Sequence, residues 1–290
     1  MNNDTNTTLN AAAIAAGCAA SASRIAIEVV AETGSTNADL LARLPGAAKA
    51  TGEAAALGQD GQDALGDTGL LDGPTLRIAH VQTAGRGRAG RPWLSAPGAS
   101  LTFSLAWPFK GPLQQLAGLP LAVGVAIAET VASLGVPVQL KWPNDVLRDS
   151  AKLAGILVET QSASDGRIWA VIGCGMNLLM PDELEAGIGR SDVAAAPWLA
   201  QMERNALVAA LLSRLAGALA EFDDTGFAAF AERWNALQAW RGEPVSILDQ
   251  GQIVQQGLAA GVDDIGRLLL DTPAGRVAVL SGDVSLRRAS

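Results

Sequence analysis

The hydrophobic pattern of this 290-residue chain changes abruptly at Arg241-Gly242-Glu243-Pro244. After this turn-like tetrapeptide, short apolar runs alternate with turns that contain Gly and Asp. The runs cover residues 245–248, 253–257, 268–271 and 277–280. Strand-length runs separated by such turns are typical of small all-β units. The pattern therefore predicts a C-terminal β-barrel domain over residues 242–290 and places the end of a larger domain near residue 241.

The larger domain, expected over residues 25–241, mixes strand-like and helix-like patterns. Predicted strands cover residues 25–30, 76–81, 100–107, 138–140, 153–159 and 169–174. Predicted helices cover residues 37–44, 116–134, 201–221 and 226–240. Because these elements do not alternate in regular strand–helix–strand order, the pattern predicts an α+β domain.

Two stretches lack such a pattern. Residues 1–24 are rich in Ala, and no Lys or Arg precedes Arg24. Because a secretory signal needs a basic start, we expect a poorly ordered tail here rather than an export signal. Residues 47–74, rich in Ala, Gly and Asp, are expected to form a loose insertion.

The charge balance and composition argue against several function classes. A formal net charge of -8 and a sequence pI of about 4.7 disfavour a dedicated nucleic-acid binder. No run reaches the roughly 18 consecutive apolar residues of a membrane span. Cys18 and Cys174 are too few for a disulfide framework, as in proteins of a reducing compartment. We therefore expect a cytoplasmic protein with neither a nucleic-acid nor a membrane partner.

Against this acidic background, positive charge is concentrated in the loop Gly85–Arg91, with the sequence Gly-Arg-Gly-Arg-Ala-Gly-Arg. Glycine lets backbone N–H groups approach a ligand closely, and the Arg guanidinium matches carboxylate and phosphate geometry. The loop also fits G-x-G-x-x-G, but that dinucleotide fingerprint should open a helix, whereas Pro92-Trp93 and a predicted strand follow here. The pattern favours an anion-binding loop that orders around its ligand, with a flexible solvated hairpin as the alternative. Trp93 is well placed to stack on a nucleobase.

Three further motifs place polar or small residues at strand ends. The first is Lys141–Asp145, with the sequence Lys-Trp-Pro-Asn-Asp. The Asn and Asp after the proline can orient a guanidinium or receive a nucleotide-bound metal. The alternative is that they form only an Asx-type turn. Lys152–Glu159 opens an apolar strand with a lysine, whose attraction to an anion is strengthened beside a low-dielectric region; a surface lysine is the alternative. Ile172–Leu178 contains small residues where a ligand could approach the backbone.

These four motifs, in this order, resemble those of the biotin protein ligase family. Ser35-Thr36-Asn37 is similar to an early motif of that family, and Gly282–Arg287 is similar to its usual ending. The resemblance covers about residues 26–290. It implies a class II synthetase-like catalytic domain with a mixed, mostly antiparallel sheet and helices, followed by a small SH3-like β-barrel.

The resemblance also implies a two-step reaction. The biotin carboxylate attacks the α-phosphate of ATP, which gives biotinyl-5′-AMP and pyrophosphate. A lysine amine of a biotin carboxyl carrier protein then attacks the mixed anhydride and releases AMP. Fixed positive groups would stabilise the charge on the phosphate, and a closing loop would exclude water. Biotin and ATP are the implied substrates, and Mg²⁺ is expected with ATP.

Residue roles follow from the same resemblance, motif by motif. Lys152 and Arg88 are the implied catalytic residues. The implied biotin-binding residues are Ser35, Thr36, Asn37, Gln82, Arg86, Gly87, Arg88, Lys152, Gly155 and Leu157. The implied ATP-binding residues are Arg88, Arg91, Trp93, Lys141, Asn144, Asp145, Lys152 and Asn177. Asp145 would orient an arginine, and Asn144 would help to place Mg²⁺.

Two departures from the family pattern and two alternative functions accompany this interpretation. The insertion after Asn37 is longer than the family leads us to expect, and residues 1–24 are too few for the DNA-binding domain of the repressor type. We therefore expect a monofunctional ligase.

A lipoate protein ligase, which shares the fold and the adenylation chemistry, is the main alternative, although the Gly85–Arg91 loop and Lys141–Asp145 favour biotin. A non-catalytic nucleic-acid-binding module disagrees with the net charge. The sequence leaves open whether the protein is a monomer or a homodimer.

Overall fold

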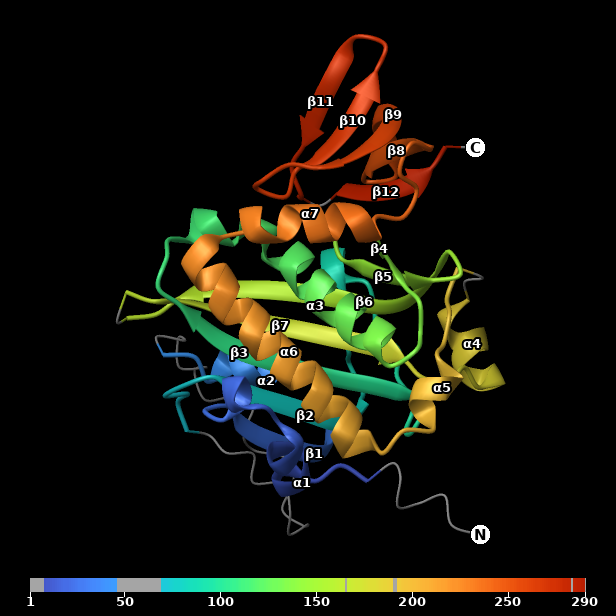
Figure 1. The fold of residues 1–290 in the computed structure, drawn as a ribbon. Helices are drawn as coiled ribbons and strands as arrows, with labels where there is room; N and C mark the ends of the chain where they lie inside the picture. Colours follow the sequence, from blue (N-terminus) through green and yellow to red (C-terminus); the bar gives the residue numbers. More distant parts are fainter. Residues whose placement is uncertain (1–7, 46–68, 165, 190–191, 283, 290) are drawn as a thin grey trace, which may run out of the picture.

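The computed structural model describes residues 8–45, 69–164, 166–189, 192–282 and 284–289 (Figure 1). Its larger domain is built on a seven-stranded sheet in the order β1-β2-β3-β7-β6-β5-β4. The strands are β1 (Ala26–Thr33), β2 (Thr75–Gln82), β3 (Ser100–Phe109), β4 (Gln139–Lys141), β5 (Asp145–Arg148), β6 (Ala151–Ser162) and β7 (Ile168–Asn177). Only β1 and β2 pair in parallel; the other neighbouring strands are antiparallel. The prediction of an α+β domain with a mixed, mostly antiparallel sheet is confirmed.

Helices cover both faces of this sheet. The α-helices are α1 (Ala11–Gly17), α2 (Thr36–Ala42), α3 (Leu119–Ser133), α4 (Asp182–Ile188), α5 (Pro197–Ala200), α6 (Arg204–Thr225) and α7 (Ala228–Leu237). Short 3₁₀ turns are η2 (Ala20–Ala22), η3 (Arg88–Gly90) and η4 (Leu113–Gly118). In Figure 1, α3 and α6 cross one face of the sheet.

Strand alternation shows that α2 packs on the opposite face. Side chains of successive strand residues point to opposite sides of a sheet. Ala170 and Ile172 of β7 belong to the core that contains α3 and α6, whereas Trp169 and Val171 pack with Leu40 of α2. The sheet therefore separates a large helical core from a smaller one, and α2 carries its polar N-terminus onto the second face.

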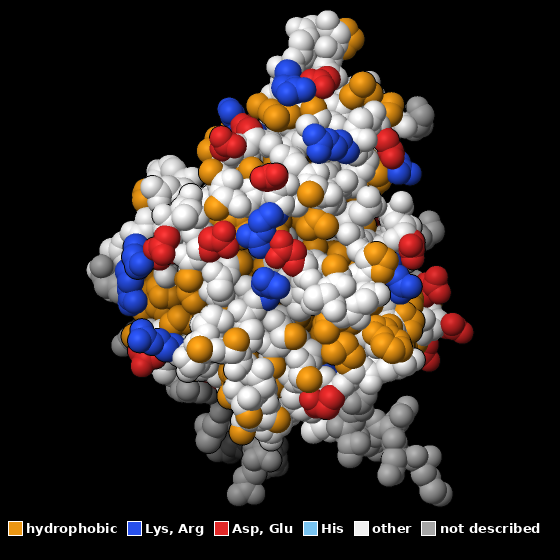
Figure 2. Space-filling model, in the orientation of Figure 1, with side chains coloured by type: hydrophobic (Ala, Val, Ile, Leu, Met, Phe, Trp, Pro, Cys, Tyr) orange, Lys and Arg blue, Asp and Glu red, His pale blue; other side chains and the backbone are white. Residues whose placement is uncertain are grey.

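Two helical segments, residues 113–133 and 204–225, are long and apolar enough on average to cross a membrane. In these segments, 72% and 61% of the residues of the apolar window are buried inside the protein. Figure 2 shows basic and acidic side chains interspersed on the face that carries α3, α6 and α7. Arg233 of α7 pairs there with Glu129 of α3 at 2.7 Å and with Glu221 of α6 at 3.3 Å. Both segments thus serve as core helices under a charged surface.

The expectation of a poorly ordered tail over residues 1–24 is wrong for the part of it that the structure describes, residues 8–24. Helix α1 packs against α6 and β1, with Ile14 completely buried. Its first turn is capped by Asn10, whose Oδ1 accepts from Ala13 N at 2.9 Å, and Asn10 N donates to Asn205 Oδ1 at 2.7 Å. Alanine favours helix and its small side chain lets two helices approach closely, which a search for large apolar residues overlooks. Residues 1–7 and 46–68 lie outside the described residues, and the second range includes residues 47–68 of the expected insertion.

The C-terminal domain is a five-stranded antiparallel sheet in the order β11-β10-β9-β8-β12. Its strands are β8 (Pro244–Asp249), β9 (Gln252–Val262), β10 (Leu268–Thr272), β11 (Gly275–Val279) and β12 (Val284–Arg288). The predicted small all-β unit is confirmed, and β12 adds a strand that the hydrophobic pattern did not predict. Closure of this sheet into a barrel stays a prediction.

The C-terminal domain packs directly on the larger one. Trp142 Nε1 donates to the carbonyl of Gly266 at 3.1 Å, and the Asn235 side chain bonds both the N–H and the carbonyl of Val262, at 2.8 and 3.1 Å. Buried apolar residues of both domains, such as Leu121 and Leu268, belong to one continuous core cluster. This packing brings β12 to the mouth of the pocket described next.

Candidate active site

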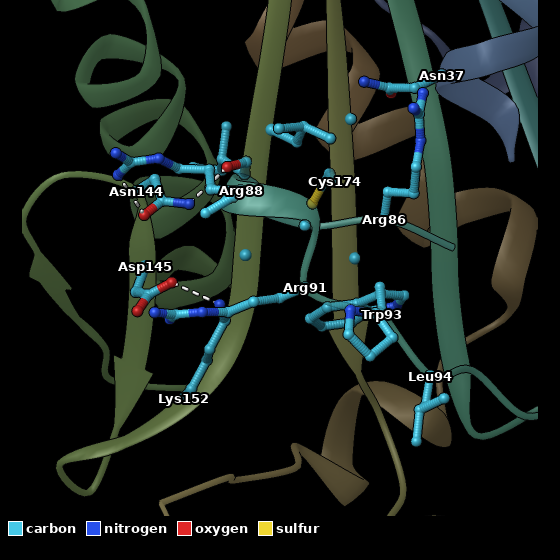
Figure 3. Close-up of a pocket in the computed structure, with 18 of the residues that line it drawn as sticks. Asn37, Arg86, Arg88, Arg91, Trp93, Leu94, Asn144, Asp145, Lys152 and Cys174 are labelled. Carbon is cyan, nitrogen blue, oxygen red and sulfur yellow. Dashed lines mark hydrogen bonds and ion pairs between the residues drawn. The ribbon is translucent and has the colours of Figure 1, made fainter. Parts of the chain in front are cut away.

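A pocket of about 330 Å³ lies on the α2 side of the sheet, above β6 and β7 (Figure 3). All the residues that the family resemblance implicates line it. They are Ser35, Thr36, Asn37, Gln82, Arg86, Gly87, Arg88, Arg91, Trp93, Lys141, Asn144, Asp145, Lys152, Gly155, Leu157 and Asn177. The structure therefore brings five separated sequence motifs into one cavity. Their individual roles in ligand binding stay predictions.

A chain of hydrogen bonds forms one wall of the pocket, at the N-terminus of α2. Thr36 N donates to Gln82 Oε1 at 2.8 Å, and the Thr36 and Ser104 hydroxyl oxygens lie 2.6 Å apart. The Ser104 hydroxyl donates to Asn37 Oδ1, and Asn37 Nδ2 donates to Glu159 Oε2 at 2.8 Å. Thr36, Asn37 and Ser104 are buried. These five side chains are called the polar chain below.

Glycines form the floor of the pocket. Gly155 of β6 and Gly175 of β7 are paired across the two strands, and Gly173 lies on the same face of β7. A Cβ added at Gly175 would overlap the Trp93 indole, and one at Gly173 would overlap the Asn37 amide. A Cβ at Gly155 would lie 2.8 Å from Lys152 Nζ. The absence of these three side chains is what leaves room for the polar chain, for Trp93 and for Lys152.

The opposite end of the pocket concentrates charge. Lys152 Nζ lies 2.6 Å from Asp145 Oδ1 (Figure 3). Lys141 Nζ lies 3.3 Å from Asp145 Oδ2. Burial opposes ionisation of the Asp145 carboxyl, but the two ammonium groups outweigh burial and hold its pKa below the usual range. Burial lowers the pKa of Lys141, and the Asp145 carboxylate opposes that shift. The expected arginine partner of Asp145 is thus replaced by two lysines. The register of β5 and β6 pairs Asp145 with Gly155, whose missing side chain leaves room for the Lys152 ammonium.

The Gly85–Arg91 loop folds over the pocket as a hairpin-like turn. Trp93 N donates to Gly85 O at 2.8 Å, and Gly87 N donates to Arg91 O at 2.7 Å. Gly90 adopts a φ of +69°, which favours glycine. No α-helix begins here, so the loop is not a dinucleotide fingerprint. Its ordering on ligand binding stays a prediction.

The arginines of this loop attach it to three other parts of the pocket. Arg86 lies 3.7 Å from Glu159 of β6. Arg88 donates to Asn144 Oδ1 at 3.3 Å and to the carbonyl of Gly282 in the C-terminal domain (Figure 3). The guanidinium groups that the sequence predicts as anion ligands are therefore already directed over the cavity.

Two buried polar atoms in the pocket have no hydrogen-bond partner among the described residues. They are Trp93 Nε1, a donor, and Asn177 Oδ1, an acceptor. Asn177 Nδ2 is held by the carbonyl of Ala194 at 3.2 Å, which directs the oxygen away from that segment. Buried polar atoms are nearly always satisfied in proteins, so an ordered water or a ligand can supply the missing partners of these two atoms.

Sequence reasoning missed two members of the polar chain. Glu159 stood in a recognised motif without a role, and Ser104 had none. Polar residues recur at every second position in Ser100, Thr102 and Ser104, so the alternation marked a polar face on an otherwise apolar strand.

Residues 284–287 of β12 also line the pocket, and Arg287 lies 3.7 Å from Asp192. Among the described residues, no group of three or more His, Cys, Asp and Glu side chains could hold a metal ion.

Comparison with known proteins gives a consistent relationship. The sequence pattern of the Biotin/lipoate A/B protein ligase family matches residues 67–177, and that of the Biotin protein ligase C terminal domain matches residues 242–287. The chain is 36% identical over 214 residues to the bifunctional ligase/repressor BirA of Escherichia coli, covering 73% of this chain and 66% of that protein. It thus spans just under two thirds of the length of that relative.

Two further relatives match over most of their length. The biotin–[acetyl-CoA-carboxylase] ligase of Mycobacterium tuberculosis is 37% identical over 267 residues, which are 89% of this chain and 88% of that protein. A biotin protein ligase from Aquifex aeolicus, solved in complex with biotin and ATP, has a TM-score of 0.66 and 26% identity, covering 91% of this chain and 99% of that one. The motifs, the fold and these similarities agree, and the chain belongs to the biotin protein ligase family.

Proposed function

We propose that this protein is a biotin protein ligase, which joins biotin to AMP with release of pyrophosphate and then transfers biotin to a lysine of a biotin carboxyl carrier protein. The observation that carries the proposal is that one pocket has two chemically different ends. The polar chain at one end suits the small heterocyclic head of biotin. Lys141, Lys152 and Arg88 at the other end suit its carboxylate and the phosphates of ATP.

Lys152 and Arg88 are proposed to act on the reacting groups in the first step. A carboxylate oxygen of biotin attacks the α-phosphorus, and the bond to pyrophosphate breaks. Lys152 lies beside the glycine floor, where a ligand can approach the backbone closely, and its ammonium would stabilise the negative charge that builds on the phosphate. Asp145 fixes this ammonium through the 2.6 Å ion pair. Arg88 would add charge from the loop above.

The nucleotide is proposed to bind at the unsatisfied atoms of the pocket. Asn177 Oδ1 can accept from an amino or hydroxyl group of ATP, and Trp93 can stack on adenine. Lys141 and Arg91 are proposed to contact the phosphates. Mg²⁺ binds oxygen ligands and usually keeps several waters, so we expect it to arrive with ATP. Asn144, which lines the pocket, would help to place it there through its side-chain oxygen.

The second step requires that an amine attacks the acyl-adenylate before water hydrolyses it. The Arg88–Gly282 hydrogen bond joins the loop to the segment that precedes β12, and such a cover would shield the mixed anhydride. We therefore assign residues 25–241 to a catalytic domain and residues 242–290 to an SH3-like domain that completes the cover. We further propose a cytoplasmic enzyme, monomeric or homodimeric, whose acceptor is an acyl-CoA carboxylase carrier subunit.

The test is a pyrophosphate-release assay with purified protein, ATP and Mg²⁺, run with biotin and with lipoate in parallel. We expect pyrophosphate release with biotin, and AMP release only after a carrier domain is added. Activity with lipoate alone would transfer the assignment to lipoate ligation. No pyrophosphate with either acid would refute ligase function.

A further inference from the structure

The polar chain contains groups that can reverse their hydrogen bonds. A hydroxyl both donates and accepts, and an amide exchanges its donor and acceptor ends by a half-turn. The Thr36 hydroxyl, the Ser104 hydroxyl and the Asn37 amide therefore have no fixed direction of their own. Any direction must come from the two ends of the chain.

The two ends of the chain do have a fixed direction. The Glu159 carboxylate accepts only, so it bonds the Asn37 amide through Nδ2, at 2.8 Å. Arg86, 3.7 Å away, adds a positive charge beside that carboxylate. At the other end, the Thr36 backbone N–H donates only, and it holds Gln82 by Oε1 at 2.8 Å. Gln82 Nε2 is thereby left to donate elsewhere.

The Glu159 end determines the direction of the bonds made by Asn37 and Ser104. With Nδ2 tied to Glu159, Asn37 Oδ1 must accept the Ser104 proton, so Ser104 has none left for Thr36. The Thr36 hydroxyl then turns its single proton toward two acceptors, Ser104 Oγ at 2.6 Å and Gln82 Oε1 at 3.0 Å. Asn37 is only 4% exposed and its amide lies over Gly173, so water cannot easily substitute for a lost partner. The wall consequently offers the second lone pair of Asn37 Oδ1 and an N–H from Gln82.

We propose that Glu159 is a positioning residue that sets this direction and thereby selects a head group with N–H donors and a carbonyl acceptor. A cyclic urea, such as the ureido ring of biotin, has this pattern, so the inference rests on the proposed function and specifies how its substrate is recognised. Glu159 acts through Asn37 and takes no part in the chemical step.

The test compares Glu159→Gln with Glu159→Asp. Gln can accept or donate, so Asn37 becomes free to turn, whereas Asp keeps an acceptor-only group. Glu232→Gln, on the exposed face of α7, is the matched control for loss of one negative charge. The ligands are biotin and its two cyclic carbamate analogues, in which one or the other ureido N–H is replaced by oxygen. Affinities are measured by titration calorimetry without ATP.

We expect the preference for biotin over at least one carbamate to fall about tenfold or more in E159Q and to be retained in E159D and E232Q. In the pyrophosphate assay, E159Q should raise the KM for biotin about tenfold and change kcat less than threefold. An E159Q protein that binds biotin with the wild-type preference would overturn the proposal. So would an equal loss of all three ligands that Asp does not rescue.

The binding readout separates this inference from the proposed function. Wild-type protein that binds biotin but releases no pyrophosphate would refute the ligase assignment, and the carbamate comparison would still decide the role of Glu159. Wild-type protein that does not bind biotin would overturn both.

Discussion

Lys152 lies where the glycine floor, the Trp93 indole and the Asp145 carboxylate meet. Its Nζ is 5.9 Å from the centroid of the indole ring and 2.6 Å from Asp145 Oδ1. The side chain is 24% exposed, so its charge is partly shielded from water and acts strongly on a neighbouring anion. A lysine placed in this way can bridge a carboxylate and a phosphate.

Replacing Lys152 by Ala should lower kcat for pyrophosphate release by about 100- to 1,000-fold, since the loss of one preorganised charge-stabilising donor has effects of this size. Arg88→Gly should also impair adenylation. Lys110→Ala, at a lysine whose side chain is 81% exposed, is the control and should be near wild type. The far-ultraviolet circular dichroism of each variant checks the fold. Full activity of the Lys152 variant would remove the residue from the chemistry.

Asp145 should make the stability of the protein depend on pH in the acid range. Its folded-state pKa is lowered, so its contribution to stability is complete above the usual Asp pKa of about 3.9 and is lost as the pH falls through the folded-state value. Asp145→Asn should therefore flatten the decline of unfolding free energy between about pH 5 and pH 3. Urea denaturation at each pH gives the slope of the unfolding free energy against pH. The slopes of the two proteins should differ by an amount that approaches the uptake of one proton on unfolding. Parallel curves would contradict the pairing.

At the scale of elements, most strands and the helices α2, α3, α6 and α7 were predicted, but strand β5 and the helices α4 and α5 were not. The run at 153–159 predicted β6, because its apolar residues are continuous. Strand β5 is four residues long and begins with Asp145, so its pattern is indistinguishable from a turn. Helices α4 and α5 likewise have too few residues for a period to show.

The candidate site followed from motifs that the sequence carries, but the contacts between them did not. Alternation assigns Ser104 and Glu159 to strand faces. It does not tell that β3 and β6 flank β7, and this sheet order is what brings both side chains to Asn37. The partners of Asp145 similarly depend on the register between β5 and β6. Such pairings are set by tertiary packing, which one sequence does not reveal.

Helix α1 should contribute to stability through Ile14. Ile14→Ala removes a completely buried side chain from the contact between α1 and α6 and should lower the free energy of unfolding by about 2–5 kcal/mol. Leu70→Ala, at a side chain 69% exposed, is the comparison and should change it by less than about 0.5 kcal/mol. Urea denaturation measures both. Equal stabilities would show that α1 does not dock in solution.

For the whole molecule, the contact between the domains depends on a close approach at Gly266. Its φ is +87°, and an added Cβ would lie 2.8 Å from Leu121 Cδ1 and 3.1 Å from Gly118 Cα in the other domain. The carbonyl of the same residue accepts from Trp142 Nε1 at 3.1 Å. Movement here would therefore disturb both the shared core and the cover of the pocket.

Gly266→Ala should destabilise the protein by about 1–3 kcal/mol more than Gly135→Ala does. Gly135 also has a φ of +87°, but an added Cβ there meets nothing within 4 Å, so it reports backbone strain alone. Thermal unfolding followed by calorimetry gives both values. If the two variants lose the same stability, the interdomain contact is looser than the structure indicates.

The glycine floor also limits how the ligand preference of this protein can change. Main-chain atoms held by the hydrogen bonds of β6 and β7 form that surface, so a point substitution can fill it but cannot deepen it. Room for a bulkier substrate has to come from wall residues that still have side chains to shorten, such as Leu157 and Leu94. Substitutions that admit larger biotin analogues are therefore expected among the wall residues. The glycine floor sets a fixed limit on the depth of the pocket for any new ligand.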